Sequence, residues 1–310
     1  MVSPRPRRLG SKALAVALAG VLHLGGITWA STPIEGPASA ALNELIQEHL
    51  TDRRIPGASI AIIGAGHQVR TAAYGTAVLQ HGVPARIDTV YEIGSLSKQF
   101  TAAAVLMLRD EGKLDLDDPI GKYVVSAPEA WSGITIRHLL THTAGLIPEG
   151  EEFASLRGQG RRHGSMEAML ESAMADSVQG DPGEHFSYGN EGYFLATLVV
   201  EMASGLSFRD FMRERIFEPL GMHQTLFQDE LRIIPNEARH YSLEVGEWVN
   251  LRRDAIEKAA GGWGMRSSSP DLVRWDRALR EYEVLSAEAH REMFEPVTLG
   301  DGSSFRYGLG

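Results

Sequence analysis

The order of apolar and polar positions predicts a helix and two strands near the N-terminus, followed by a long section with helical spacing. Ala40–Leu50 carries its leucines and isoleucine at helical intervals. Ala58–Ile63 and Val69–Tyr74 are short apolar runs on either side of a glycine-rich turn, which is typical of paired strands. From Ser95 onward, apolar residues recur at intervals of three and four as far as Gly112, which supplies a helix stop.

Helical spacing recurs through much of the remaining chain. The expected helices cover residues 135–142, 166–176, 190–204, 208–217, 271–280 and 287–294. The segment 190–204 is apolar nearly all round and should therefore be buried. Strands are expected to resume only at 305–310, so the order is strands, a long helical section and then strands again.

The composition excludes several classes of function. The 310 residues include no cysteine, which excludes disulfides, cysteine nucleophiles and cysteine-ligated zinc. The net charge is −10, which argues against nucleic acid as a partner because phosphate binding needs clustered cations. Lysine is rare, with five lysines against 25 arginines, so the position of each lysine is informative.

Residues 1–30 have the layout of an export signal. They begin with four basic and no acidic side chains, Ala13–Ile27 is mostly small and apolar, and small residues precede a possible cleavage at Ser31. The apolar run of about fifteen residues is shorter than the roughly 20 that a spanning helix needs. We therefore expect an exported protein, periplasmic or extracellular, with a membrane anchor as the alternative.

Common catalytic and metal motifs do not occur in this sequence. It contains no Gly-x-Ser-x-Gly, no phosphate-binding P-loop, no Gly-x-Gly-x-x-Gly and no His-Glu-x-x-His. His138 and His142 are four residues apart and could share a helix face as metal ligands. No acidic residue accompanies them at metalloprotease spacing, so we interpret them as making local hydrogen bonds beside a turn. We expect neither a metal nor an organic cofactor.

Ser95 and Lys98 form a Ser-x-x-Lys motif at the start of a predicted buried helix. One helical turn places residues i and i+3 on the same face. A desolvated lysine amine can take the proton of a serine hydroxyl and make it nucleophilic. The helix N-terminus would also stabilise negative charge that develops near Ser95. Alone, the pair is equally compatible with a capping serine and a solvated lysine.

Tyr188 and Asn190 form a Tyr-x-Asn motif between a turn-rich stretch and the second predicted buried helix. A phenol near a lysine ammonium can have its pKa lowered and then act as a base. An asparagine amide can hold both a substrate carbonyl and a lysine. The alternative is a core tyrosine followed by an asparagine that caps the helix. Together the two motifs favour acyl transfer through a serine.

The segment Tyr91–Ala102 resembles the nucleophile segment of the serine beta-lactamase-related proteins. It is most similar to class C beta-lactamases, D-alanyl-D-alanine carboxypeptidases and related esterases. The likeness continues through residues 114–120, 134–146, 182–193, 219–222, 261–265 and 267–275. The resemblance implies that Ser95 is the acylated nucleophile, Lys98 its proton partner and Tyr188 the second acid/base group. It implies Asn190 as a contact to the substrate and to the lysine.

The resemblance also implies an α+β fold of the α/β-sandwich type. A sheet lobe flanked by helices and a helical lobe at about 91–260 would make up a beta-lactamase-like domain at 39–310, after a linker at 31–38. The sequence departs from the family in two places. Gly189 stands where serine or alanine is usual. The third family motif, a Lys-Thr-Gly or His-x-Gly triad on a late strand, would follow Gly310, so we expect the C-terminal strands of the fold to lie beyond that residue.

The expected partner is a small-molecule or peptide substrate: a beta-lactam, a D-Ala-D-Ala-type peptide or a small ester. We expect no nucleic-acid partner and no stable membrane span after removal of the signal. A non-hydrolysing binding or sensor protein that keeps the penicillin-binding-like fold is the alternative from another functional class. The substrate depends on the shape of the cleft, and the sequence specifies neither it nor the oligomeric state.

We predict that protein secreted by an export-competent host begins near Ser31, because the basic start, the apolar run and the small residues before Ser31 together form a cleavable signal. Mass spectrometry of the N-terminal peptide measures this directly. A mature product that keeps Met1 and fractionates with membranes would contradict the prediction and favour the anchor.

Overall fold

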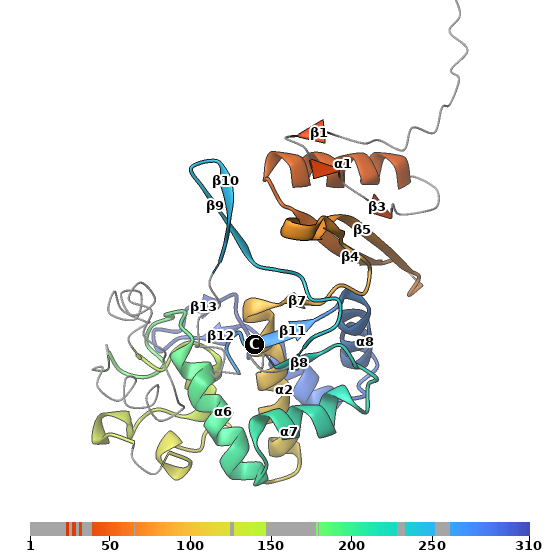
Figure 1. The fold of residues 1–310 in the computed structure, drawn as a ribbon. Coiled ribbons are helices and arrows are strands. Elements are labelled where there is room, and N and C mark those ends of the chain that lie inside the picture. Colours follow the sequence, from red (N-terminus) through yellow and green to blue (C-terminus); the bar gives the residue numbers. More distant parts are fainter. Residues whose placement is uncertain are drawn as a thin grey trace, which may run out of the picture.

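Helices and short antiparallel sheets alternate along the chain, so the fold is α+β, as expected (Figure 1). The computed structural model describes residues 39–64, 66–124, 127–146, 178, 180–227, 233–251 and 261–310, and the backbone of short strands at 23–24, 27–28 and 31–32. Most of the predicted export signal and the expected helix at 166–176 lie outside the described residues. Within them, no helix is both long and apolar enough to cross a membrane.

A four-stranded antiparallel sheet forms the N-terminal part of the fold. Its strands are β3 (Ser31–Thr32), β4 (Gly57–Ile63), β5 (Val69–Val78) and β6 (Val83–Pro84). The order is β3-β5-β4, and β6 also pairs with β5. β4 and β5 pair along the whole of β4, which confirms the two predicted strands. β3 consists of the first two residues of the expected linker.

Helix α1 (Ser39–Asp52) packs on this sheet, as the apolar spacing predicted. Its Leu42, Ile46 and Leu50 follow one another at four-residue intervals, so they share a face. Ile60 and Ile62 of β4 alternate onto one side of the sheet and pack in the same cluster. Helix α8 (Ser269–Arg280) also contacts β4, and the sheet lies between α1 and the helical body (Figure 1).

Helix α2 (Ser97–Asp110) is the central element of the helical body. Ten of its 14 residues are buried, and it contacts α6 (Glu191–Ser204) and α9 (Ala287–Met293). Its Phe100 stacks on Trp275 of α8, with ring centroids 4.1 Å apart. Among the described residues, the other helical elements are α3 (Ile136–Leu140), α7 (Phe208–Met212), η1 (Leu79–His81), η2 (Gly94–Leu96), η3 (Ile120–Lys122), η4 (Glu129–Trp131) and η5 (Arg213–Phe217).

Short strands lie within the section that the sequence predicted to be helical. β7 (Tyr91–Glu92), β8 (Leu226–Phe227) and β11 (Met265–Ser267) form a sheet in the order β7-β11-β8. β9 (Tyr241–Glu244) and β10 (Glu247–Asn250) form a hairpin that projects from the body (Figure 1). Two further short strands, β1 (His23–Leu24) and β2 (Ile27–Thr28), pair near the N-terminus. Strands of two to four residues are too short for apolar alternation to reveal.

The strand expected at 305–310 is wrong beyond its first residue. β12 (Val297–Thr298) pairs with β13 (Ser304–Phe305), and the chain then leaves the strand conformation. Leu309 N–H donates to the carbonyl oxygen of Met293 at 2.9 Å. The carbonyl oxygen of Tyr307 still accepts from Val297 N–H of β12 at 2.8 Å, whereas Leu309 is bonded to the end of α9.

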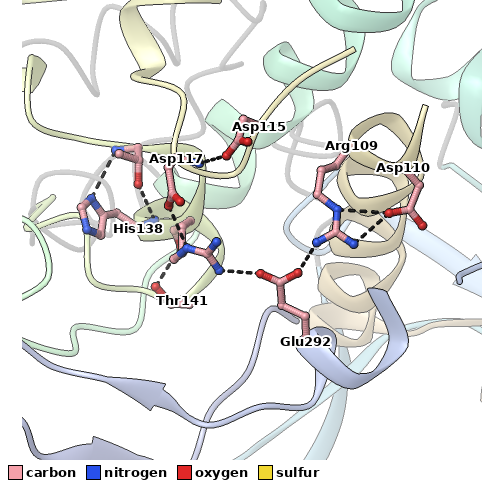
Figure 2. A network of polar contacts seen from close by, with 9 residues as sticks. Arg109, Asp110, Asp115, Asp117, His138, Thr141 and Glu292 are labelled. Carbon is pink, nitrogen blue, oxygen red and sulfur yellow. Dashed lines mark hydrogen bonds and ion pairs between the residues drawn. The ribbon is translucent and has the colours of Figure 1, made fainter. Parts of the chain in front are cut away.

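A charged network ties α9 to α2 and α3 (Figure 2). Glu292 of α9 binds Arg109 of α2, and it binds Arg137 of α3 at 2.7 Å. Arg137 also binds Asp117 at 2.9 Å. One carboxylate thus joins three helices, and it stands next to Met293, to which the C-terminal segment is bonded.

We predict that Gly192→Ala destabilises the protein although alanine is the better helix former. A Cβ at this position of α6 would lie 2.7 Å from the carbonyl oxygen of Leu139, which is backbone and cannot turn away. Overpacking costs about 1–3 kcal/mol, whereas the gain in helix propensity is at most about 1 kcal/mol. Chemical denaturation measures the difference.

Gly121→Ala is the matched control, because its Cβ would meet no atom within 4 Å. We expect its free energy of unfolding to stay within about 0.5 kcal/mol of the wild type. Equal stability of the two variants would show that α6 and α3 can separate at no cost.

Candidate active site

The serine and lysine of the first motif lie side by side at the N-terminal end of α2. Ser95 is part of the turn η2, Lys98 is in the first turn of α2, and Lys98 Nζ is 3.4 Å from Ser95 Oγ. Ser95 is exposed, whereas the lysine is only 1% exposed. The alternative of a capping serine with a solvated lysine is therefore wrong.

Two acceptors from distant parts of the chain hold the lysine amine. Lys98 Nζ donates to Asn190 Oδ1 at 2.7 Å and to the carbonyl oxygen of Gly262 at 3.0 Å. Asn190 immediately precedes α6, but its side chain makes no capping bond there. Asn190 thus stands at the N-cap position of α6, but its side chain binds the lysine instead of capping the helix, and the two sequence motifs meet at the lysine.

Glycine at 261 allows the backbone to reach the lysine. A Cβ on Gly261 would lie 2.3 Å from Thr197 Oγ1, so there is no room for a side chain beside α6. Thr101 of α2 donates its hydroxyl to the carbonyl oxygen of Gly261 at 2.8 Å. The backbone therefore passes close to both helices and brings the next carbonyl, that of Gly262, to Lys98.

Ser97 supports the turn that carries Ser95. Its hydroxyl is buried, donates to the carbonyl oxygen of Gly94 at 2.7 Å and accepts from Met265 N–H at 3.3 Å. Both bonds are internal to the protein. The geometry therefore distinguishes Ser95, which is accessible, from its neighbour two residues later, which is not.

Tyr188 and Ser95 line the same pocket. The Tyr188 side chain is 45% exposed, and its ring centroid lies 4.9 Å from Lys98 Nζ. The pocket has a volume of about 580 Å³ and is lined by Ile93, Ser95, Leu96, Gln99, Tyr188, Met293, Phe294, Tyr307 and Gly310. The structure thus brings all four residues singled out from the sequence to one place: Asn190, the Tyr188 ring and Ser95 all lie beside the Lys98 amine, and Ser95 and Tyr188 line the pocket.

His142 lies beneath Tyr188 and is nearly buried, at 5% exposure. Gly189 N–H donates to its Nδ1 at 3.3 Å, so the proton of a neutral ring is on Nε2. Nε2 lies 3.1 Å from the Tyr307 hydroxyl and therefore donates to it. Burial, together with the charge of Lys98, lowers the pKa of His142 to about 3. Burial likewise raises the pKa of Tyr307 to about 12.

His138, the other histidine of the pair, takes part in a capping box at the start of α3. Its Nδ1 accepts a hydrogen bond from Thr135 N–H at 3.2 Å (Figure 2). His142 has left the helix and has a left-handed backbone with φ 58°, so the two rings do not share a helix face. In the part of the chain that the structure describes, no group of histidine and acidic residues could hold a metal ion.

A family model described as Beta-lactamase matches residues 42–310. The chain belongs to the beta-lactamase family. Penicillin-binding protein 4* of Bacillus subtilis (strain 168) is 29% identical over 253 residues, which are 77% of this chain and 55% of that protein. Protein flp of Staphylococcus aureus (strain N315) is 27% identical over 287 residues, 90% of this chain and 57% of that protein. The chain thus spans somewhat more than half the length of these curated relatives.

Solved structures show the same fold. The octameric penicillin-binding protein homologue from Pyrococcus abyssi matches with a TM-score of 0.76 and 29% identity, over 88% of this chain and 64% of that one. The D-amino acid amidase from Ochrobactrum anthropi SV3, solved with L-phenylalanine amide, matches with a TM-score of 0.71 and 27% identity, over 83% and 75%. These relatives confirm the beta-lactamase-like fold and a serine hydrolase family.

Three residues of this beta-lactamase-family site escaped the sequence analysis. Gly262 supplies a backbone carbonyl, and the sequence signals for it were a pair of adjacent glycines and the family likeness of residues 261–265, neither of which assigned it a role. His142 was interpreted as a local hydrogen-bonding residue, although it touches the Tyr-x-Asn segment. Tyr307 lies 165 residues from its histidine partner, and the sequence contained no signal for that contact.

We predict that His142 makes the protein less stable as the pH falls from about 6.5 towards 3. In the unfolded chain the imidazole takes up a proton near its ordinary pKa of 6.5, whereas the folded protein keeps it neutral to about 3. The unfolded state therefore binds more protons in this window, and the free energy of unfolding falls by about 1.4 kcal/mol per pH unit on this account.

His142→Asn removes this titration and keeps the other groups around the ring, which are Lys98, Tyr188, Tyr193 and Tyr307. Urea unfolding at pH 7, 6, 5 and 4 measures the stability difference between the two proteins. We expect this difference to shift in favour of the variant with each step below pH 6.5. If the free energies of unfolding of the wild type and the variant changed in parallel with pH, His142 would take up its proton in the folded state as it does in the unfolded chain, contrary to the prediction.

Proposed function

We propose that this protein is a serine hydrolase that works through an acyl-enzyme on Ser95. The observation that carries the proposal is the buried Lys98, with its Nζ 3.4 Å from Ser95 Oγ and held by Asn190 and a backbone carbonyl. Burying a lysine is unfavourable unless its nitrogen is hydrogen-bonded. A lysine that is buried and yet within reach of an exposed serine is suited to move that serine's proton.

The proposed reaction begins when Ser95 Oγ attacks the substrate carbonyl. The hydroxyl proton passes to the Lys98 and Tyr188 pair as the carbon–oxygen bond forms. The bond to the leaving group then breaks, and the leaving group takes up that proton. Water next attacks the acyl carbon and gives a proton to the same pair. The bond between the acyl carbon and Ser95 Oγ then breaks, the pair returns the proton to Oγ, and the acid leaves.

The position of Ser95 supports the stabilisation of an oxyanion. It stands directly before α2, a helix of 14 residues whose N-terminal N–H groups favour nearby negative charge. The pocket beside it is lined mainly by apolar and aromatic side chains: Ile93, Leu96, Tyr188, Met293, Phe294 and Tyr307. This lining favours a substrate with an uncharged apolar or aromatic group next to the scissile bond.

The proposed substrate is accordingly a small ester or amide, with beta-lactams and D-Ala-D-Ala-type peptides as the competing carbonyl compounds. The amide-binding relative from Ochrobactrum anthropi supports this choice, since its structure holds L-phenylalanine amide. The export signal predicted at residues 1–30 supports a proposed site of reaction outside the cytoplasm.

We predict that a fluorophosphonate or penicillin probe labels the complete protein on a peptide containing Ser95 and that Ser95→Ala abolishes the labelling. Lys98→Ala and Tyr188→Phe should each slow acylation by about 10²–10⁴-fold, the usual contribution of a general base. Lys113→Ala is the control, because this lysine is exposed and paired with Glu111. Peptide mass spectrometry and stopped-flow labelling provide the two readouts.

Labelling at Ser97 or Ser187 would reject Ser95 as the nucleophile. Rates within about threefold of the wild type for both Lys98→Ala and Tyr188→Phe would reject the proton relay.

A substrate panel on the complete protein separates the remaining possibilities. The panel contains a p-nitrophenyl ester with an apolar acyl group, a D-Ala-D-Ala peptide and a beta-lactam. We expect the ester to give the highest kcat/KM. Labelling of Ser95 without turnover of any compound would instead favour the non-hydrolysing binding or sensor protein.

A further inference from the structure

We propose that His142 is a positioning residue whose neutral, Nε2-protonated imidazole holds the Tyr188–Asn190 segment in the geometry that acylation needs. The inference rests on the acyl-transfer function proposed above. It adds a side chain that acts through Tyr188 and Asn190 without touching the reacting atoms.

The described residues 180–190 belong to no helix or strand, so contacts with other segments position Tyr188–Asn190. His142 provides two of these contacts, with its carbonyl oxygen accepting from Ser187 N–H at 2.8 Å and its Nδ1 from Gly189 N–H at 3.3 Å. Its neighbour Thr143 accepts from Gly183 N–H at 2.8 Å. The turn at 142–143 thus holds this loop at three places, and the last is between Tyr188 and Asn190.

The imidazole also contacts Tyr188 directly. The two ring centroids are 4.3 Å apart, and the same tyrosine ring lies 4.9 Å from Lys98 Nζ. A change in the position of the imidazole would therefore move the phenol relative to the lysine and to Ser95. Misplacing a catalytic group by about 1 Å can cost about 10²-fold in rate.

The other side of the imidazole is anchored in the core. Nε2–H donates to the Tyr307 hydroxyl at 3.1 Å, and the Tyr307 and Tyr193 hydroxyls are hydrogen-bonded to each other. Tyr193 of α6 donates to the carbonyl oxygen of Leu140 at 2.7 Å. A chain of hydrogen bonds therefore runs from the loop to α6 and to the end of α3, and it fixes both the orientation of the ring and its tautomer.

Two substitutions distinguish the role of Nδ1, which accepts from Gly189 N–H, from the role of Nε2–H, which donates to Tyr307. In His142→Asn the amide oxygen takes the place of Nδ1 and keeps an acceptor for Gly189 N–H. Asparagine also tolerates the left-handed backbone at this position. In His142→Gln the amide N–H group takes the place of Nε2–H, and the acceptor for Gly189 is lost.

We expect His142→Gln to lower the rate of Ser95 acylation by about 10²-fold and His142→Asn to recover most of that loss. The KM for the ester should change by less than about threefold in both, since neither side chain touches the substrate. His138→Gln is the matched control for His142→Gln. The Nδ1 of His138 also accepts a backbone N–H, but at the start of α3, and glutamine loses that acceptor too, so this variant should lower the melting temperature and leave the rate unchanged.

Rates that fall equally in the two His142 variants, in step with their melting temperatures, would overturn the inference in favour of a purely structural role. An acid limb of the pH–rate profile that disappears in His142→Asn would overturn it too, because the imidazole would then be a proton-transfer group itself. Labelling of the wild type tested against Ser95→Ala decides separately whether the acyl-transfer function holds.

The tautomer provides a test that needs neither a variant nor activity. Imidazole ¹⁵N chemical shifts of the complete protein at pH 7 should show His142 as neutral with its proton on Nε2. A proton on Nδ1, or an imidazolium at this pH, would overturn the inference.

Discussion

Burial of the Lys98 amine is the constraint on which the rest of the site depends. A lysine nitrogen taken out of water costs several kcal/mol unless acceptors replace the lost hydration. The protein supplies them from two places, the side chain of Asn190 and the backbone of Gly262. The start of α6 and the approach to β11 must therefore both come to α2. The glycine at 261, which leaves room for no Cβ beside Thr197, follows from that close approach.

The same constraint places the proposed nucleophile at a boundary between protein and solvent. Lys98 belongs to the packed side of α2, whereas Ser95, one turn earlier, faces the pocket. A proton-transfer partner shielded from water and a hydroxyl open to substrate are what an acyl-transfer site requires. The pairing of β7 with β11 fixes the position of Ser95 relative to Gly262, the backbone acceptor of Lys98, because it joins residues shortly before Ser95 to residues shortly after Gly262.

The outer wall of the pocket is held by contacts of a different kind. Met293 and Phe294 follow Glu292, whose carboxylate binds arginines on both α2 and α3 (Figure 2). Tyr307 is bonded to His142, which also holds the loop that carries Tyr188. The ion pairs of Glu292 and the hydrogen bonds of His142 thus connect five segments of the chain: α2, α3 with the turn after it, α9, the loop that carries Tyr188, and the segment of Tyr307.

The sequence by itself determined the local features of this protein. Helices α1, α2 and α6 and the β4–β5 pair could be predicted because their apolar periodicity is set by burial of one face or, in α6, of nearly all faces. The Ser95–Lys98 pair could be predicted because helix geometry alone places residues three apart on one face. Tyr188 and Asn190 were recognised as a Tyr-x-Asn motif. No local rule connects that motif to Lys98, and the family resemblance implied the connection.

Only the tertiary structure decided the contacts between segments far apart in the chain. The carbonyl of Gly262, the neutral ring of His142 and the hydroxyl of Tyr307 bond to partners between 47 and 165 residues away. Such contacts leave no periodic signal in the sequence, and strands of two or three residues leave none either. The segment after Phe305 has a strand-like pattern. Its Tyr307 carbonyl oxygen accepts from Val297 of β12, but Leu309 bonds to the end of α9, since hydrogen-bond partners are set by what packs beside a segment.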